Sequence, residues 1–211
     1  MKKASCNSQP LLNLPSNPLL IVLSGPSGAG KDALLTRLKQ SGYPLKYVTT
    51  ITTRAKRAKE KDNEDYHFVS TKKFQEMIEH KELLEWANVY GNWYGVPKQP
   101  VRDALARGQD TIVKVDIQGA ATIKKIVPEV VLIFLIPPSM EELVIRLNQR
   151  HTELPFDLAL RIKTAEEEIK QLPLFDYVII SKQDKFDAAV SDIKAIITAE
   201  KRRVNPLKIT L

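Results

Sequence analysis

Cysteine is nearly missing from this sequence of 211 residues: Cys6, close to the N-terminus, is the single one. A lone cysteine cannot form a disulfide within the chain, which excludes a fold held together by disulfides. Chains without disulfides are typical of the reducing cytosol, so we expect a cytoplasmic protein. Its fold must then depend on a hydrophobic core, and 43% hydrophobic residues over this length are enough for one domain.

Long apolar runs are missing as well, because none approaches the roughly 18 residues that a membrane-spanning helix needs. Residues 1–17 contain Lys2 and Lys3 but no continuous apolar stretch, and Pro10 and Pro15 interrupt them. This segment is a poor signal peptide and predicts a flexible leader. We therefore expect no membrane partner.

Aromatic residues are few, at 7%, and acidic residues are outnumbered, since 32 Lys and Arg stand against 25 Asp and Glu for a net charge of +7. A basic chain suits polyanionic ligands. Nucleic acid is one candidate, but the basic residues are dispersed and are not interleaved with aromatic ones, unlike those of a nucleic-acid-binding surface. We expect a basic surface around a phosphate site and no nucleic-acid partner.

One stretch, residues 19–38, combines three features that belong together. Leu19 to Ser24 is apolar and predicts a buried strand, a glycine-rich segment follows, and the apolar spacing from Ala33 to Leu38 predicts a helix. Strand, glycine-rich loop, lysine and helix in this order are typical of a phosphate-binding loop, where backbone N–H groups, the helix N-terminus and the lysine face phosphate oxygens. The residues predicted to bind ATP are Gly25, Pro26, Ser27, Gly28, Ala29, Gly30, Lys31 and Asp32.

Asp32 stands where this loop pattern usually has a serine or threonine that binds Mg²⁺. Two interpretations are open. A carboxylate in the first turn of a helix is favoured by the helix dipole and needs no ligand. Against this, an unshielded carboxylate about 4 Å from a nucleotide phosphate would cost roughly 4 kcal/mol at an effective dielectric constant near 20. We therefore predict that Asp32 binds Mg²⁺, directly or through water, and that Mg²⁺ accompanies ATP as the cofactor.

Predicted strands and helices alternate over most of the chain. This alternation indicates an α/β fold of three layers, with a parallel sheet covered by helices on both faces. The highly charged segment 51–95 breaks the alternation and predicts an inserted, mixed lobe. Within it, residues 83–90 predict a strand and Gly91 begins a turn, and no further strand is predicted before the helix at 98–107.

The remaining residues divide into a core and a tail. The core comprises residues 18–50 and 96–203, and residues 204–211 form the tail. Ligands of such sheets bind at the carboxyl ends of the strands. Thr50 ends the predicted strand 46–50 and Asp116 follows the predicted strand 111–115, so both should lie beside the phosphate-binding loop.

A second group of side chains lies in the predicted lobe. Arg54 and Arg57 follow a hydroxyl-rich segment and can form a bidentate clamp on a phosphate monoester. Tyr66 and Tyr94 supply phenolic donors, and Glu85 is a carboxylate inside an otherwise apolar strand. Each also has a plain structural interpretation, since Glu85 could face solvent and Tyr94 could be a core aromatic.

The order and spacing of six motifs resemble those of guanylate kinases, a family of P-loop nucleoside monophosphate kinases, over roughly residues 19–199. The motifs are Thr52-Thr53-Arg54-x-x-Arg57, Asp65-Tyr66-x-Phe68-Val69, Leu84-Glu85-Trp86, Gly91-Asn92-Trp93-Tyr94-Gly95, Val115-Asp116-x-Gln118-Gly119 and Arg146-Leu147-x-x-Arg150-x-Thr152-Glu153. The resemblance implies a P-loop NTPase fold for residues 18–203, with 51–95 as the GMP-binding lobe and about 146–161 as a short lid.

The resemblance also implies an activity and a set of site residues. The activity is ATP-dependent phosphorylation of GMP to GDP in purine nucleotide metabolism, with ATP and GMP as partners. Glu85 would accept hydrogen bonds from guanine N1 and N2, Thr50 would reach O6, and Asp116 would lie between the two nucleotides. The implied GMP-binding residues are Thr50, Arg54, Arg57, Tyr66, Glu85, Tyr94 and Asp116. The implied catalytic residues are Lys31, Arg54, Arg146, Arg150 and Arg161.

Four residues depart from the family pattern: Asp32, Val96, Lys114 and His151. Asp32 and Val96 resemble the pattern of ribose 1,5-bisphosphate phosphokinases, so a kinase for another phosphorylated acceptor is an alternative. A non-catalytic guanylate-kinase-like module and a nucleic-acid-binding ATPase are two more. The motif around Glu85 argues against the first alternative, and Lys31 against the second, because such modules tend to lose this lysine. The sequence leaves the oligomeric state open.

Overall fold

The computed structural model describes residues 17–58, 60–89, 91–148, 155–182 and 185–211, without the side chains of 155–158. Its strands are β1 (Leu20–Ser24), β2 (Lys46–Val48), β3 (Ile51–Thr52), β4 (His67–Phe68), β5 (Leu83–Val89), β6 (Asn92–Pro97), β7 (Thr111–Lys114), β8 (Val131–Ile136) and β9 (Tyr177–Ile180). Its helices are α1 (Lys31–Gln40), α2 (Thr71–Glu79), α3 (Lys98–Ala106), α4 (Ile117–Ile126), α5 (Met140–Asn148), α6 (Pro155–Ile169), the 3₁₀ helix η1 (Leu172–Leu174) and α7 (Phe186–Glu200).

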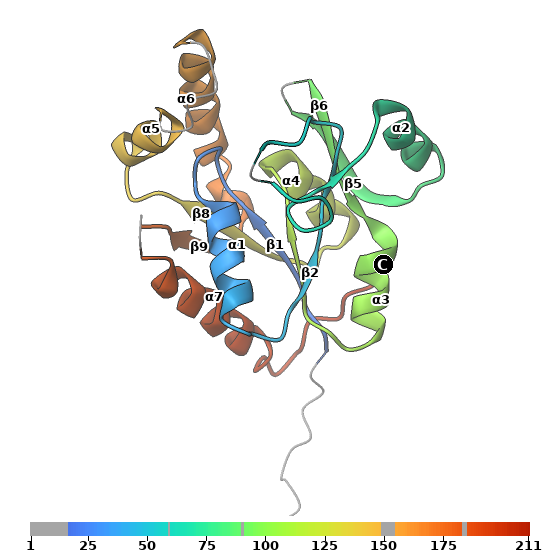
Figure 1. The fold of residues 1–211 in the computed structure, drawn as a ribbon. Helices are drawn as coiled ribbons and strands as arrows, with labels where there is room; N and C mark the ends of the chain where they lie inside the picture. Colours follow the sequence, from blue (N-terminus) through green and yellow to red (C-terminus); the bar gives the residue numbers. More distant parts are fainter. Residues whose placement is uncertain (1–16, 59, 90, 149–154, 183–184) are drawn as a thin grey trace, which may run out of the picture.

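The larger of two sheets has five strands in the order β2-β7-β1-β8-β9, and all its pairings are parallel. Strand β1 lies at its centre and is buried along its whole length. The chain leaves β1 toward β2 on one side and later crosses to β8 and β9 on the other (Figure 1). The carboxyl end of β1, where a ligand of such a sheet is expected, therefore carries the glycine-rich loop.

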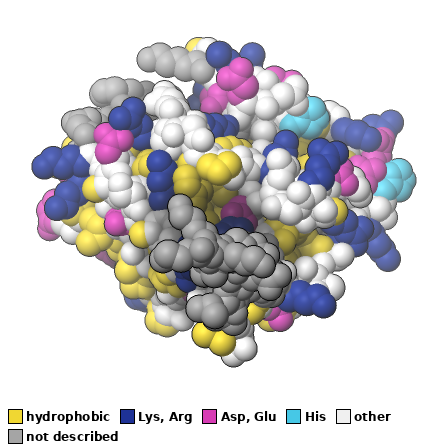
Figure 2. All heavy atoms as spheres, turned by 90° about the horizontal axis from the view of Figure 1, so that it is seen from below, with side chains coloured by type: hydrophobic (Ala, Val, Ile, Leu, Met, Phe, Trp, Pro, Cys, Tyr) yellow, Lys and Arg dark blue, Asp and Glu magenta, His cyan; other side chains and the backbone are white. Residues whose placement is uncertain are grey.

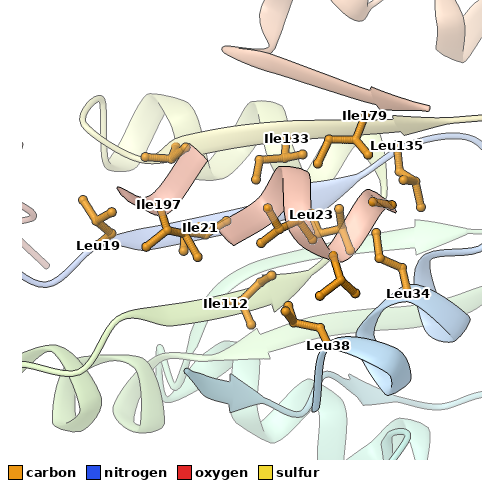
Figure 3. Close-up of a cluster of buried hydrophobic side chains, with 14 of the residues drawn as sticks. Leu19, Ile21, Leu23, Leu34, Leu38, Ile112, Ile133, Leu135, Ile179 and Ile197 are labelled. Atoms are coloured by element: carbon orange, nitrogen blue, oxygen red, sulfur yellow. The ribbon is translucent and has the colours of Figure 1, made fainter. Parts of the chain in front are cut away.

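Helices cover this sheet on both faces because the side chains of β1 alternate between two hydrophobic clusters. Leu19, Ile21 and Leu23 belong to the cluster that includes residues of α1 and α7 (Figure 3). Leu20 and Val22 belong to the other cluster, with residues of α3 and α4. Each fully buried leucine or isoleucine stabilises the fold by about 1.5–3 kcal/mol. The prediction of a three-layer α/β fold with a parallel sheet is confirmed.

The smaller sheet, of order β4-β3-β6-β5, forms the lobe, and it is mixed: β3 pairs in parallel with β4, whereas β6 pairs antiparallel with β3 and β5. The sequence did not predict β6, because Gly95 and Pro97 weaken its strand pattern. Gly95 fits closely there, since a Cβ atom would lie 3.0 Å from the Leu83 side chain and 3.1 Å from that of Phe74. Strand β6 also runs across the predicted boundary between lobe and core.

The predicted tail, residues 204–211, packs back against the core. Leu207 contacts the cluster shared with α1 and α7, and Ile209 and Leu211 contact the cluster on the other face. The Asn17 side-chain amide donates a hydrogen bond to the Leu207 carbonyl at 3.0 Å, which joins the two ends of the described chain.

The surface carries dispersed charge. On the face seen in Figure 2, lysine and arginine side chains lie scattered among polar and hydrophobic ones, with acidic side chains between them. Among the described helices, none is both long and apolar enough to cross a membrane.

The junction of β1 and the glycine-rich loop generates a testable prediction at Gly25. Its φ of +142° disfavours alanine, and a Cβ atom there would lie 2.1 Å from the Leu135 carbonyl oxygen of β8. We expect Gly25→Ala to lower the free energy of unfolding by about 3 kcal/mol or more. The measurement is the midpoint of urea unfolding.

Gly42→Ala is the matched control. Gly42 also has a positive φ, +67°, but no heavy atom of the described chain lies within 4 Å of its added Cβ atom. Its substitution should cost only about 1 kcal/mol. Equal losses in the two variants would contradict the idea that backbone contact with β8 constrains the loop.

Candidate active site

A cavity of about 470 Å³ lies at the carboxyl edge of the large sheet, between the glycine-rich loop and the lobe. It gathers most of the predicted site residues from distant parts of the chain. Those that line it are Gly25, Ser27, Gly28, Ala29, Gly30, Lys31, Asp32, Thr50, Arg54, Arg57, Tyr66, Glu85, Tyr94, Asp116 and Arg161. Pro26 and Arg146 are not among its lining residues, and Arg150 lies outside the described residues.

The glycine-rich loop wraps around the Lys31 side chain. The Lys31 ammonium donates hydrogen bonds to the carbonyl oxygens of Gly25, at 2.5 Å, and Pro26, at 3.2 Å. Burial lowers the pKa of Lys31 to about 8, although Glu168 and Asp32 act in the opposite direction. An anionic oxygen is a stronger acceptor than a carbonyl, so a phosphate inside this loop can recruit the ammonium.

Two side chains of α6 support the same loop. Arg161 is 9% exposed, and its Nη2 donates to the Ser27 hydroxyl at 2.6 Å. Glu168 accepts a hydrogen bond from the Ser27 backbone N–H at 3.4 Å. Sequence reasoning missed Glu168, because it ends a run of three acidic residues that resembles a solvated helix face. Arg161 is therefore buried against the loop and does not lie on a solvated helix face.

Glu85 is a buried carboxylate in the lobe. It lies on β5, is 4% exposed, and its Oε2 has no hydrogen-bond partner among the described residues. Burial raises the pKa of Glu85 to about 8, and the nearby Asp116 carboxylate adds to the increase. The alternative of a solvent-facing glutamate is therefore wrong. A buried polar atom without a partner costs free energy, and such atoms are expected where a ligand supplies the missing bonds.

Gly119 leaves the space that Glu85 occupies. A Cβ atom at Gly119 would lie 2.7 Å from Oε2 of Glu85 and 3.0 Å from the Val115 side chain. The Asp116 carboxylate caps α4 by accepting a hydrogen bond from the Gly119 N–H at 2.7 Å. In the sequence, Gly119 was only one residue of a motif. Its role in leaving space for Glu85 follows from the packing of α4 against β5.

The rest of the lobe contributes cations and phenols. Arg54 is held by Glu60, at 2.7 Å between Nη2 and Oε1, and its guanidinium lies 5.4 Å from the centre of the Tyr66 ring. The rings of Tyr66 and Tyr94 lie edge to face, 5.9 Å apart. Arg57 approaches the same Glu60 oxygen at 3.8 Å. These groups converge on one side of the cavity, as a clamp for a phosphate would.

The Thr50 side chain, predicted to reach guanine O6, is committed to the backbone. Its hydroxyl donates a hydrogen bond to the Lys114 carbonyl at 3.0 Å, and the residue is 5% exposed. In this arrangement Thr50 offers the cavity an acceptor, whereas guanine O6 requires a donor. The Thr50 contact with O6 stays a prediction.

Arg146 lies under the loop instead of over the cavity. Its guanidinium donates to the Ser181 hydroxyl at 2.9 Å, to the Ser181 carbonyl at 2.7 Å and to the Ala29 carbonyl at 3.3 Å. The Ser181 hydroxyl itself donates to Ala29 at 2.6 Å. Arg146 and Ser181 thus tie the loop to the end of β9. Ser181 carries no motif, so sequence reasoning missed it.

A lysine neutralises the Asp32 carboxylate. The predicted metal role assumed an unshielded carboxylate, and that assumption is wrong. Asp32 and Lys114 form an ion pair between Oδ1 and Nζ, and the Lys114 side chain is 10% exposed. Among the described residues, no group of three or more His, Cys, Asp and Glu side chains could hold a metal ion. The binding of Mg²⁺ by Asp32 stays a prediction.

Comparison with known proteins agrees with this geometry. A family model described as guanylate kinase matches residues 17–200. Guanylate kinase 2, chloroplastic/mitochondrial, of Oryza sativa subsp. japonica is 45% identical over 206 residues, which cover 97% of this chain and 72% of the rice protein. The guanylate kinase of Carboxydothermus hydrogenoformans is 45% identical over 190 residues, 89% of this chain and 92% of that protein. The crystal structure of guanylate kinase from Anaplasma phagocytophilum matches with a TM-score of 0.74 at 33% identity, and the match covers 90% of each chain.

The burial of Glu85 predicts an unusual dependence of stability on pH. A glutamate has an ordinary pKa of 4.5, and that of folded Glu85 is about 8. The folded chain binds this proton more tightly, so the contribution of Glu85 to stability is full below pH 4.5 and is lost as the pH rises through 8. Glu85→Gln cannot ionise, and we expect it to exceed the wild type in free energy of unfolding by about 2–4 kcal/mol at high pH.

Urea unfolding of both proteins between pH 5 and about 9 measures this difference. The control is Glu79→Gln, at an exposed glutamate of α2, which should follow the wild type at every pH. A Glu85→Gln variant that is less stable than the wild type throughout this range would show that the carboxylate stabilises the fold.

Proposed function

This chain belongs to the guanylate kinase family, and we propose that it transfers the γ-phosphoryl group of ATP to GMP, giving ADP and GDP. The observation that carries the proposal is the buried Glu85 carboxylate, which lies in the same cavity as the phosphate-binding loop. One of its oxygens has no hydrogen-bond partner among the described residues. In this proposal the lobe recognises the guanine base of GMP, and the phosphate-binding loop binds the phosphates of ATP.

Base selection rests on matching hydrogen-bond groups. Guanine presents two donors, N1–H and the 2-amino group, along the edge where adenine presents an acceptor and a C–H group. A carboxylate supplies two acceptors. Guanine bound to Glu85 would therefore satisfy its orphan oxygen and favour its ionised form, whereas adenine would leave it desolvated and unpaired.

Phosphoryl transfer then requires position and charge. A phosphate oxygen of GMP attacks the γ-phosphorus atom of ATP, the bond to the bridging oxygen breaks, and ADP leaves with that oxygen. No general base is needed, because the attacking oxygen is already anionic. Arg54, Arg57, Tyr66 and Tyr94 would hold the GMP phosphate, and Lys31 would offset the charge on the transferring group.

The remaining arginines act around the loop. Arg161 would orient Ser27, and Arg146 would position Ala29 through the contacts described above. We keep the prediction that Arg150 belongs to a lid over ATP. Kinases of this family use ATP, generally with a divalent metal ion. We propose that Mg²⁺ enters with ATP, as part of the donor substrate, and offsets phosphate charge there.

The ribose 1,5-bisphosphate alternative gains nothing from Val96. This side chain is fully buried in the hydrophobic cluster shared with α3 and α4, and it is not among the residues that line the cavity. A ribose acceptor would also leave the Glu85 oxygen without a donor of the kind that guanine offers.

An acceptor panel tests this function. With ATP as donor, we expect phosphorylation of GMP to exceed that of AMP, CMP, UMP and ribose 1,5-bisphosphate by about a hundredfold or more, measured by coupled release of ADP. Glu85→Gln should weaken GMP binding by about tenfold to a hundredfold, since one carboxylate acceptor becomes a donor. Comparable rates with AMP, or activity on the ribose compound alone, would refute the proposal.

Lys31→Ala tests the donor side. Removing this ammonium should lower turnover by about a hundredfold to a thousandfold, because it acts on charge that develops in transfer. Lys39→Ala, at an exposed lysine of the same helix, is the control and should keep its turnover. If Lys31→Ala loses activity only in proportion to a lowered melting temperature, Lys31 has a structural role instead.

A further inference from the structure

Lys114 is the last residue of β7, and its side chain lines the cavity. Its ammonium pairs with Asp32 in the first turn of α1, and lies 4.0 Å from the centre of the Tyr66 ring in the lobe. Its backbone carbonyl accepts the hydrogen bond of Thr50. Lys114 thus contacts α1, the helix that follows the phosphate-binding loop, and Tyr66 of the lobe.

This ammonium stays charged although its side chain is only 10% exposed. Burial by itself would lower the pKa of Lys114, but Asp32 and Tyr66 outweigh it and hold the pKa above the ordinary value. Lys114 is also close enough to Lys31 to contribute to the lowering of that residue's pKa. Lys31 and Lys114 both line this cavity, together with the Asp32 carboxylate that pairs with Lys114. A cavity lined by two ammonium groups suits a polyanionic ligand.

The position of Lys114 matters for the reaction proposed above. ATP and GMP are both polyanions, and their phosphates must come into contact where the loop meets the lobe. A fixed cation at this junction offsets their repulsion without reorganisation. Asp32 belongs to the donor side and Tyr66 to the acceptor side, so a group held between them lies where the two sets of phosphates meet.

We propose that Lys114 is a phosphate-binding residue at the junction of the two nucleotide sites, and that Asp32 is the positioning residue that holds its ammonium there. The inference rests on the proposed function and deepens it. It also assigns to Asp32 a task that differs from binding Mg²⁺, because the carboxylate acts on the substrates through Lys114. The two tasks predict different behaviour in variants.

The first experiment compares ligands with and without phosphate. Calorimetric titration of GMP and of guanosine, in EDTA, is carried out on the wild type and on Lys114→Met. We expect the GMP dissociation constant to rise about tenfold and the guanosine constant to stay unchanged. Lys114→Arg keeps the charge and should retain most of the GMP affinity. It also provides a second variant if the methionine substitution perturbs the fold.

The matched control is Lys124→Met. Lys124 also forms an ion pair with an aspartate, Asp176, at 3.3 Å, but neither residue lines the cavity. This variant should bind GMP as the wild type does. Equal losses of GMP affinity in the two methionine variants, or an equal loss of guanosine affinity in Lys114→Met, would overturn the inference.

A double-mutant cycle separates the two tasks of Asp32. Asp32→Asn, Lys114→Met and the combined variant are titrated with GMP in EDTA and with ADP at several Mg²⁺ concentrations. If Asp32 acts through Lys114, Asp32→Asn weakens GMP binding in the wild type, has little further effect in Lys114→Met, and leaves the Mg²⁺ dependence of ADP binding unchanged. A changed Mg²⁺ dependence in both backgrounds would overturn the inference and support a metal ligand.

The acceptor panel on the wild type keeps the two proposals apart. If the wild type does not phosphorylate GMP, the proposed function fails. If it does, and Lys114→Met binds GMP as tightly as the wild type, the inference on Lys114 alone fails.

Discussion

Strand β1 is buried against helices on both faces, and its carboxyl end carries the glycine-rich loop. Because Gly25 packs directly against the backbone of β8, the loop leaves the sheet in one direction. Helix α1 follows the loop and begins at Lys31. The contact between Gly25 and β8 therefore also sets the direction of the Lys31 side chain and of the N–H groups in the first turn of α1. The rest of the cavity is arranged around this anchored loop, through Arg146 and Ser181 below it and Arg161 beside it.

The cavity combines charges that the fold does not satisfy by itself. Glu85 is buried, with one oxygen that has no hydrogen-bond partner in the described part of the chain. The Lys31 ammonium donates to backbone carbonyls instead of anions. Both groups are raised in free energy by burial, which appears as pKa values moved toward neutral forms. A ligand that supplies the missing partners stabilises Glu85 and Lys31 strongly. The two groups lower the stability of the free protein and make binding selective.

Lys114 and Asp32 illustrate how two departures from a family pattern can be one feature. Each alone is unfavourable beside a nucleotide: Asp32 repels phosphates, and Lys114 is a cation with little access to solvent. Their ion pair holds the Lys114 ammonium between α1 and the Tyr66 ring of the lobe. Replacing either residue removes this ion pair, which links two positions 82 residues apart in the chain.

The amino-acid sequence by itself determined the phosphate-binding loop, the parallel three-layer core, the inserted lobe and the family, because each depends on residues that are neighbours in the chain or on a regular spacing. The missed strand β6, the burial of Glu85 behind Gly119, the place of Arg146 under the loop and the pairing of Asp32 with Lys114 were decided only by the tertiary structure. These features join segments far apart in the chain. The segment that packs against a carboxylate decides whether it faces solvent, a cation or a cavity. The spacing of residues in the sequence does not specify that segment.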